Sequence, residues 1–361
     1  MVLVRRAVND WYNGVMHPTH PFRIFGVSAF LTIALGVAVA INGGIAALWI
    51  YLVLVILEIT FSFDNAVVNS RILIRLSKFW QTLFLTVGIF FAVFVVRFLL
   101  PVIIVSVATG LNFGEVIGLA INAPQVYASE LHHSEPLINA FGGTFLVMIG
   151  LSYFIDREKS IHWIHPEKAL ARLARIRYIR LILILIATLI IGSTVDPSLH
   201  IVVLWSSLAG IVLHIGLEGM AALFGDGEDK SKKKGKKPTQ MVGMAAFAMF
   251  CYLQVLDASF SFDGVIGAFA ITTSVFLIMA GLGAGAVWVR SLTVYLVRTG
   301  TLAKYRYLEH GAHWAIFALG VMMLAKLYHI ELPEWATGGL GLVFIIGALT
   351  SSILEQRRNV K

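Results

Sequence analysis

Two stretches of the chain decide its fold, LEITFSFDNAV at residues 57–67 and LDASFSFDGVI at residues 256–266. Each places an acid six residues before an aspartate, across a shared Phe-Ser-Phe, and the four acids are Glu58, Asp64, Asp257 and Asp263. All four lie inside long apolar runs. An ionisable side chain at membrane depth costs about 2.5 kcal/mol or more, so it marks a candidate functional site. The matched motifs therefore predict an internal repeat with chemistry at its centre.

The composition indicates that lipid is the solvent for most of the chain. Hydrophobic residues make up 58% of its 361 residues and charged residues only 13%, whereas a soluble domain carries about 25% charged residues. The mean hydropathy is +0.84. Lipid offers no hydrogen-bond partner to a free backbone group, and the apolar runs lack strand alternation, so we expect helices. The sequence thus predicts an all-α, polytopic membrane protein.

About ten apolar runs are long enough to cross the roughly 30 Å hydrocarbon layer as helices. They lie at residues 24–42, 45–70, 80–105, 138–155, 179–193, 199–222, 241–272, 275–297, 312–328 and 337–354. Lys and Arg cluster in alternate connections, whereas the other connections carry mainly acids. The positive-inside rule then places both termini in the cytoplasm. The basic loops also account for the net charge of +8, which therefore requires no nucleic-acid partner.

The two motifs lie five crossings apart, so their helices run through the membrane in opposite directions. The helices that follow also match, because Gly88 precedes Arg97 by nine residues and Gly281 precedes Arg290 by nine. This is an inverted repeat, an architecture of secondary transporters that bind their substrate between the repeats. We divide the chain into a first membrane half, a basic cytoplasmic linker and a second membrane half, at residues 1–225, 226–240 and 241–361, with repeat cores at 45–155 and 241–330.

The polar residues of the two motifs form an oxygen-rich set. Six residues turn an α-helix by about 600°, so the two acids of one motif face different sides of an unbroken helix. We therefore expect helix breaks at Phe61–Asn65 and Phe260–Gly264, with free backbone carbonyls beside the acids. Carboxylate, hydroxyl, amide and carbonyl oxygens suit a hard divalent cation. The candidate metal ligands are Glu58, Asp64, Asn65, Asp257, Asp263, Ser62 and Ser261, with Glu58 and Asp257 at the centre.

A structural role is the main alternative, in which the acids form static ion pairs with Arg97 or Arg290. If both arginines reach the site, four carboxylates and two guanidiniums leave a charge of −2, which a divalent cation neutralises. Three weaker clusters of histidines and acids are explained by packing, capping or a solvated loop as well as by a site. They are His214 with Glu218; Glu130, His132, His133 and Glu135; and Glu309, His310 and His313.

The paired motifs resemble those of the TerC family of bacterial membrane proteins. The segments AFGGTFLVMIGLSYF (140–154), VRSLTVYLV (289–297) and YLEHGAHWAI (307–316) are similar to a subfamily within it. The resemblance implies a fold like that of lysine-exporter-type transporters, a place in the bacterial inner membrane, and a link to tellurium resistance or manganese export. One position departs from a symmetric repeat, because Gly264 stands where the first motif has Asn65.

Three functions are compatible with these features. The first is a secondary transporter that exports a divalent cation, manganese or calcium, through the paired motifs. The second is a membrane scaffold in a metal- or tellurite-stress response. The third is an intramembrane hydrolase with paired aspartates, but the GxGD signature is absent from the spans, so we expect no enzyme and no cofactor. A Walker A pattern is also absent, so ATP does not drive transport from this chain. The oligomeric state is left open.

Overall fold

The computed structural model describes residues 20–156, 159, 161–225, 240–330 and 334–359. These residues form helices and no strand, with one isolated bridge between Leu76 and Met241. The all-α fold class is therefore confirmed. The predicted basic linker at 226–240 lies, except for its last residue, outside the described residues.

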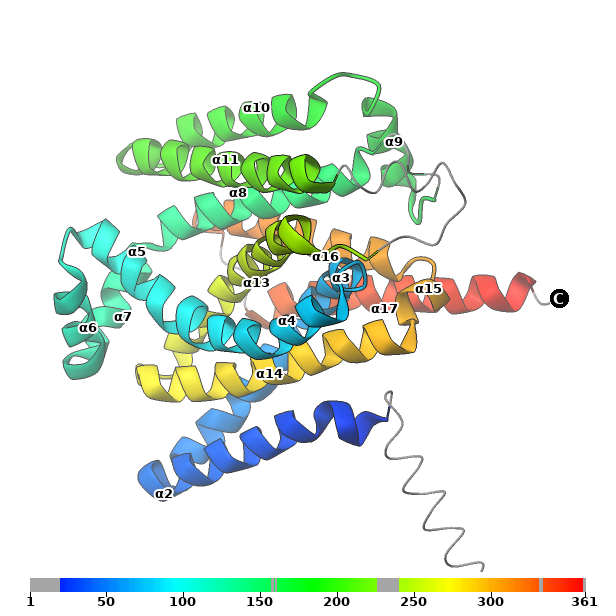
Figure 1. Cartoon of the computed structure of the whole chain (residues 1–361). Helices are drawn as coiled ribbons and strands as arrows, with labels where there is room; N and C mark the ends of the chain where they lie inside the picture. The colour runs from blue at the N-terminus through cyan, green and yellow to red at the C-terminus, as the bar shows by residue number, and fades with distance from the viewer. Residues whose placement is uncertain (1–19, 157–158, 160, 226–239, 331–333, 360–361) are drawn as a thin grey trace, which may run out of the picture.

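The helices form one bundle (Figure 1). Their bounds are α2 Pro21–Phe61, α3 Phe63–Leu73, α4 Lys78–Phe90, η1 Phe91–Leu99, α5 Leu100–Thr109, α6 Phe113–Asn122, α7 Pro124–His133, α8 Glu135–Phe154, α9 His165–Leu173, α10 Ile179–Thr194, η2 Pro197–Leu199, α11 His200–Gly225, α13 Gly243–Ile271, α14 Val275–Thr299, α15 Thr301–Lys304, α16 Leu308–Lys326 and α17 Glu334–Asn359. Within the described residues, eight helical stretches are long and apolar enough to cross a membrane. The chain is thus a multi-pass membrane protein, and every predicted span falls on a helix.

Helix α2 contains the first predicted span and most of the second, which ends on α3, because its backbone turns sharply at Gly44 (φ 72°, ψ −169°). Glycine has no Cβ and adopts this positive φ without strain. The two arms, residues 21–43 and 45–61, then fold against each other, and the Tyr51 hydroxyl donates to the Thr32 carbonyl at 2.9 Å. The fifth predicted span is α10, an apolar helix of 16 residues.

The third predicted span is continuous from α4 to α5 but contains a nine-residue π-helix, η1. Pro101 stands one turn after Arg97 and has no N–H to donate to the Arg97 carbonyl. A missing i→i−4 hydrogen bond favours a local change of helix type. Such π segments are common at functional sites, and this one carries Arg97.

Helix α14 packs along both arms of α2. The first arm runs against it, since Ser28 lies 2.7 Å from Ser291 and Trp288 donates to Thr32 at 2.9 Å. Along this arm, residues with higher numbers contact α14 residues with lower numbers, so the first arm is antiparallel to α14. The second arm, which turns back at Gly44, must then run parallel to α14.

The second arm confirms that direction, because Gly281 packs on Leu54 and Gly285 packs on Glu58. Helices α13 and α14 are joined by only three residues, 272–274, and form an antiparallel hairpin. The motif helix of the first half therefore runs opposite to α13, the motif helix of the second half. The predicted inverted relation between the two motifs is confirmed.

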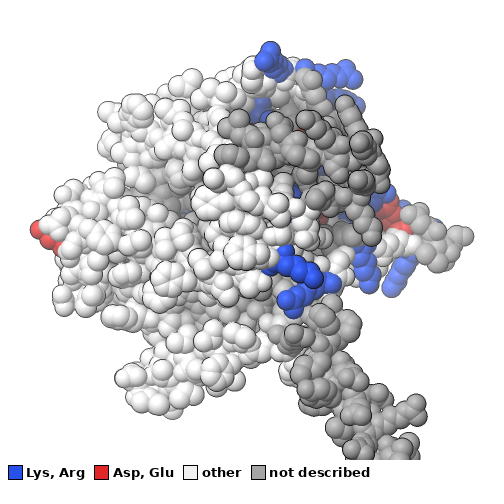
Figure 2. All heavy atoms as spheres, viewed as in Figure 1, with Lys and Arg blue, Asp and Glu red and all other residues white. Residues whose placement is uncertain are grey.

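Charge is concentrated at one end of the bundle. Figure 2 shows Lys and Arg gathered where α9, α15 and the end of α17 lie, on the right of Figure 1. We call this the basic end, and its exposed members are Arg75, Lys78, Lys168, Arg172, Arg175, Arg177, Arg298, Lys304, Arg306, Arg357 and Arg358. The opposite end is formed by α6 and α7. The predicted alternation of basic and acidic connections therefore corresponds to the two ends of the bundle.

Candidate functional site

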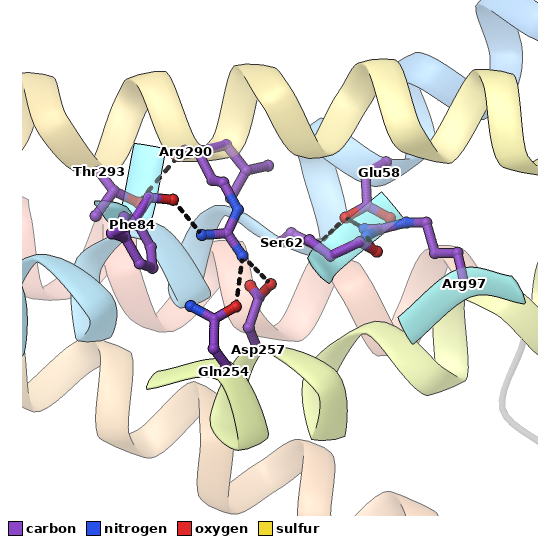
Figure 3. Close-up of polar contacts among 10 residues, drawn as sticks. Glu58, Ser62, Phe84, Arg97, Gln254, Asp257, Arg290 and Thr293 are labelled. Carbon is purple, nitrogen blue, oxygen red and sulfur yellow. Dashed lines mark hydrogen bonds and ion pairs between the residues drawn. The ribbon is translucent and has the colours of Figure 1, made fainter. Parts of the chain in front are cut away.

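The carboxylate of Glu58 is held in a buried ion pair with Arg97 of the π-helix (Figure 3). Arg97 donates through Nη2 to Oε1 of Glu58, and the Ser62 hydroxyl donates to the same oxygen at 2.8 Å. The other guanidinium nitrogen, Nη1, donates to the Ala92 carbonyl at 2.7 Å. Glu58 and Arg97 are each 3% exposed. The π-helix thus fixes the arginine from its own backbone, five residues back.

The second motif repeats this arrangement with Asp257 and Arg290. Arg290 donates through Nη2 to Oδ2 of Asp257 at 2.8 Å and to Gln254 Oε1 at 3.4 Å. Its Nη1 donates to the Phe84 carbonyl of α4 at 3.1 Å, and the guanidinium lies over the Phe84 ring. The sequence had indicated neither Gln254 nor the carbonyl of Phe84, since nothing in a sequence gives the direction of a buried guanidinium.

The two ion pairs lie side by side between α2, η1, α13 and α14 (Figure 3). Glycines permit the close approach of the helices. A Cβ added to Gly285 would lie 2.5 Å from the Cβ of Glu58, and one added to Gly88 would lie 2.6 Å from Nη1 of Arg290. Each glycine belongs to one half and contacts the ion pair of the other half. Two carboxylates and two guanidiniums give this cluster a net charge of zero.

The predicted helix breaks are largely absent. Helix α13 runs without interruption through Phe260–Gly264, so the prediction is wrong for the second motif. In the first motif only Ser62 departs from helical geometry (φ −99°, ψ 17°), and its N–H still donates to the Glu58 carbonyl at 3.0 Å. The reason is that each central acid finds its arginine on a neighbouring helix. The backbone therefore has no need to unwind to bring two acids together.

The acids of one motif consequently face different ways, as an unbroken helix requires. Asp64 is buried near α17, where its Oδ2 lies 3.8 Å from the position of a Cβ on Gly341. Its Oδ1 accepts from the backbone N–H of Asn65 at 2.9 Å. Ser261 is buried within α13, and the side chain of Asp263 lies outside the described part of the structure. Arg97 and Arg290 bind the central acids Glu58 and Asp257.

The described side chains do not form a ready-made metal cluster. Among the residues described, no three His, Cys, Asp or Glu side chains lie close enough to hold one metal ion together. Glu58 and Asp257 are hard oxygen ligands, but each is occupied by a guanidinium. A divalent cation therefore fits this donor set only if it takes the place of the arginines.

A comparison with protein families identifies the chain. A family model described as "Protein of unknown function (DUF475)" matches residues 63–359. The chain belongs to the DUF475 family. No curated protein and no solved structure matches it significantly. The matched DUF475 region includes Arg97 and the whole Asp257–Arg290 pair, and it begins just after Glu58 and Ser62.

This DUF475 chain has a second polar region at its basic end. A cavity of about 310 Å³ lies between α3, α8, α11, α13 and α16. Its charged and aromatic lining comprises Arg71, Arg75, Tyr153, Asp156, His214, Glu218, Tyr252 and His313. On α3, Val68 and Arg71 follow Asp64 at intervals of four and three residues, so the cavity adjoins the helix face that bears this acid.

Members of the weaker clusters of the sequence make pairwise contacts. Glu309 pairs with Arg71 beside this cavity. His214 lies 3.0 Å from the Ser152 hydroxyl and 3.9 Å from Glu218. At the opposite end of the bundle, His132 binds Glu135 at 2.5 Å.

Glu167 is a buried acid that the sequence interpretation missed. It accepts from His310 at 2.7 Å, Trp314 at 2.9 Å and the Trp163 N–H at 3.1 Å, and Lys159 lies 3.5 Å away. Burial opposes its charge, but the hydrogen bond from His310 and the charges of His310 and Lys159 lower the pKa of Glu167 below its ordinary value. This carboxylate therefore connects the segment before α9, through the Trp163 N–H, to His310 and Trp314 of α16. The signal in the sequence was that Glu167 is the one acid in the strongly basic stretch 159–180.

Proposed function

We propose that this chain is a secondary transporter that exports a divalent cation, manganese or calcium, from the bacterial cytoplasm across the inner membrane. In this proposal both termini and the basic end face the cytoplasm, in keeping with the positive-inside rule. The observation that carries the proposal is the matched pair of buried acid–arginine contacts, Glu58–Arg97 and Asp257–Arg290, on oppositely directed helices. A purely structural bundle needs no such repetition of costly buried charges.

Arg97 and Arg290 act in this proposal as internal substitutes for the cation. When both guanidiniums leave, Glu58 and Asp257 together carry −2, which one divalent cation neutralises. Mn²⁺ and Ca²⁺ accept such carboxylate oxygens, and the hydroxyl of Ser62 adds a neutral oxygen. The return of the arginines then expels the cation, so the site never holds uncompensated charge in the membrane. The cavity at the basic end serves as the cytoplasmic entrance.

Two further observations support transport. The motif pair resembles that of the TerC family, several members of which are implicated in manganese export. The inverted relation of α2 and α13 is typical of secondary transporters, which alternate access by moving one repeat against the other. The chain has no Walker A pattern, so an ion gradient, most simply of protons, is the proposed energy source.

The competing function is a membrane scaffold in a metal- or tellurite-stress response. The observation that favours it is the completeness of the ion pairs, which leave no net charge at the centre. In a scaffold these pairs are static and no cation displaces the arginines.

Flux in sealed vesicles distinguishes the two functions. The purified protein is reconstituted, and entry of Mn²⁺ or Ca²⁺ is followed with an enclosed dye. The double variant Glu58→Gln/Arg97→Gln removes one ion pair while keeping the centre neutral, and we expect it to insert and to lose flux. Glu115→Gln, in an exposed capping box that glutamine preserves, is the matched control. If the parent protein moves neither ion faster than empty vesicles, the scaffold replaces the transporter.

A further inference from the structure

A second cavity, of about 260 Å³, lies between the π-helix and α5 on one side and α8, α11, α13 and α16 on the other. Its lining is apolar, whereas the cavity at the basic end has a charged and aromatic lining. Ser259 is the one polar residue in the lining, and its hydroxyl already donates to the Val255 carbonyl at 2.9 Å. Apart from the acceptor side of this one hydroxyl, the lining offers no polar side-chain group to a cation, to water or to a polar solute.

The cavity lies at membrane depth and is open to the lipid side. Val95 and Val96 line it near the middle of the α4–α5 span, and Ala258 lines it near the middle of α13. Lining residues on the outer helices, such as Leu100 and Leu213, are partly exposed. Val212, which neighbours the lining residue Leu213, has 61% of its surface exposed on the outside of the bundle. The medium that reaches this opening is therefore the acyl region of the bilayer.

We propose that one acyl chain of a membrane lipid occupies this cavity. An empty apolar cavity destabilises a protein in proportion to its volume, so an apolar occupant is favoured. A transmembrane helix of a partner or of a second copy is about 10 Å wide, too thick for this space, whereas an acyl chain is slender and flexible. The inference goes beyond cation transport, since the ligand is a lipid tail and the site excludes charge.

The occupant sits against both halves of the central site. Val96 precedes Arg97 in the π-helix, and Ala258 follows Asp257 in α13, and both contact the cavity. An acyl chain in this cavity therefore contacts both the helix that carries Arg97 and the helix that carries Asp257.

Photolabelling tests the site directly. The purified protein is reconstituted with a phosphatidylcholine that bears a diazirine midway along one acyl chain, irradiated, digested and examined by mass spectrometry. We expect adducts on cavity residues of α13, at 255–259, which the bulk lipid does not reach. The variant Ala258→Phe fills the cavity, and we expect the α13 adducts to be lost. Val212→Phe, on the exposed face of α11, is the matched control and should keep them.

Several outcomes overturn the proposal. Unlabelled α13 in the parent protein means that the cavity is dry, as some apolar cavities are. Equal labelling of α13 in the parent and in Ala258→Phe means that the adducts arise elsewhere. Phosphatidylethanolamine and phosphatidylglycerol probes are also compared. If only one of these headgroups gives labelling, the protein recognises the lipid through its headgroup, outside this cavity. If Ala258→Phe does not fold, the smaller filling variant Ala258→Leu replaces it, and reduced α13 labelling is required.

Discussion

The guanidinium of Arg290 lies 2.8 Å from the carboxylate of Asp257, and the two residues stand at matching heights on the two arms of the α13–α14 hairpin. Arg97 and Glu58 make the corresponding contact in the first half. Breaking a buried ion pair on one side leaves an uncompensated charge, which costs about 3–5 kcal/mol. Each charge of these pairs therefore requires its partner in the folded protein.

A double-mutant cycle measures this coupling. We expect Arg290→Met to destabilise the protein by about 3–5 kcal/mol, because Asp257 is left buried and charged. Asp257→Asn/Arg290→Met should recover most of that loss, since neither charge remains. Unfolding in detergent, followed by denaturant titration, provides the free energies. A single variant as stable as the parent contradicts a tight buried pair.

Glycine at position 285 is required by packing. Gly285→Ala places a Cβ 2.5 Å from the Cβ of Glu58 and 3.0 Å from the Val55 carbonyl, so α14 and α2 must move apart. We expect a loss of about 1–3 kcal/mol from overpacking. Gly118→Ala is the matched control, because nothing lies within 4 Å of its Cβ. That helical position should gain up to about 1 kcal/mol from alanine's higher helix propensity. Equal effects at the two positions argue against the close contact.

Stability should rise with pH in a window set by Lys159. Burial lowers the pKa of this lysine to about 8, against the opposing pull of Glu167, whereas an unfolded lysine titrates near 10.4. Below pH 8 Lys159 is protonated in both the folded and the unfolded state, and the folded state carries the full free-energy cost of burying its charge. Between the two pKa values the unfolded state binds more protons, so stability increases with pH.

The variant Lys159→Met isolates that contribution. Its advantage in melting temperature over the parent should be largest near neutral pH and should shrink as the pH approaches 10.5. Taking the difference between the two proteins cancels the titration of the other lysines and tyrosines. A difference that stays constant over this range shows that Lys159 is not the group responsible.

The orientation proposal predicts opposite locations for two accessible positions. Gly110 ends α5 at the end of the bundle formed by α6 and α7, and Arg358 lies in the last turn of α17 at the basic end. Reporter fusions after Arg358 should be active in the cytoplasm, and a reporter inserted at Gly110 should be active outside. Activity of both on the same side refutes the ten-span topology.

The sequence predicted the helices well because each span depends on a local sum of transfer free energies. Gly44 falls between the first two predicted spans, where α2 turns back. The inverted relation followed from the number of crossings and is confirmed by the packing of α14 on Leu54 and Glu58. These features can be predicted without knowing which side chains contact one another.

The site was predicted less completely because it depends on rotation about each helix axis. Glu58 and Asp257 are buried at the centre as expected, but the sequence did not decide whether Arg97 and Arg290 bind them. Asp64 was placed in the same ligand set, yet it lies towards α17. We inferred the helix breaks because the two acids of one motif cannot face a common site from an unbroken helix. The arginines remove this requirement, because each central acid pairs with an arginine on a neighbouring helix. Glu167 was overlooked because its partners lie on a helix more than 140 residues away.

The pairing of each acid with an arginine of its own half has a consequence for biosynthesis. During synthesis, Glu58 and Arg97 leave the ribosome long before Asp257 exists, and the early part of a chain generally folds first. A lone carboxylate in the bilayer would be costly at that stage. Because its counter-ion arrives within the next hairpin, the Glu58 carboxylate can be inserted already neutralised by Arg97. Chains truncated after Gly225 are thus expected to resist alkaline extraction, and the same chains with Arg97→Met should be extracted or degraded.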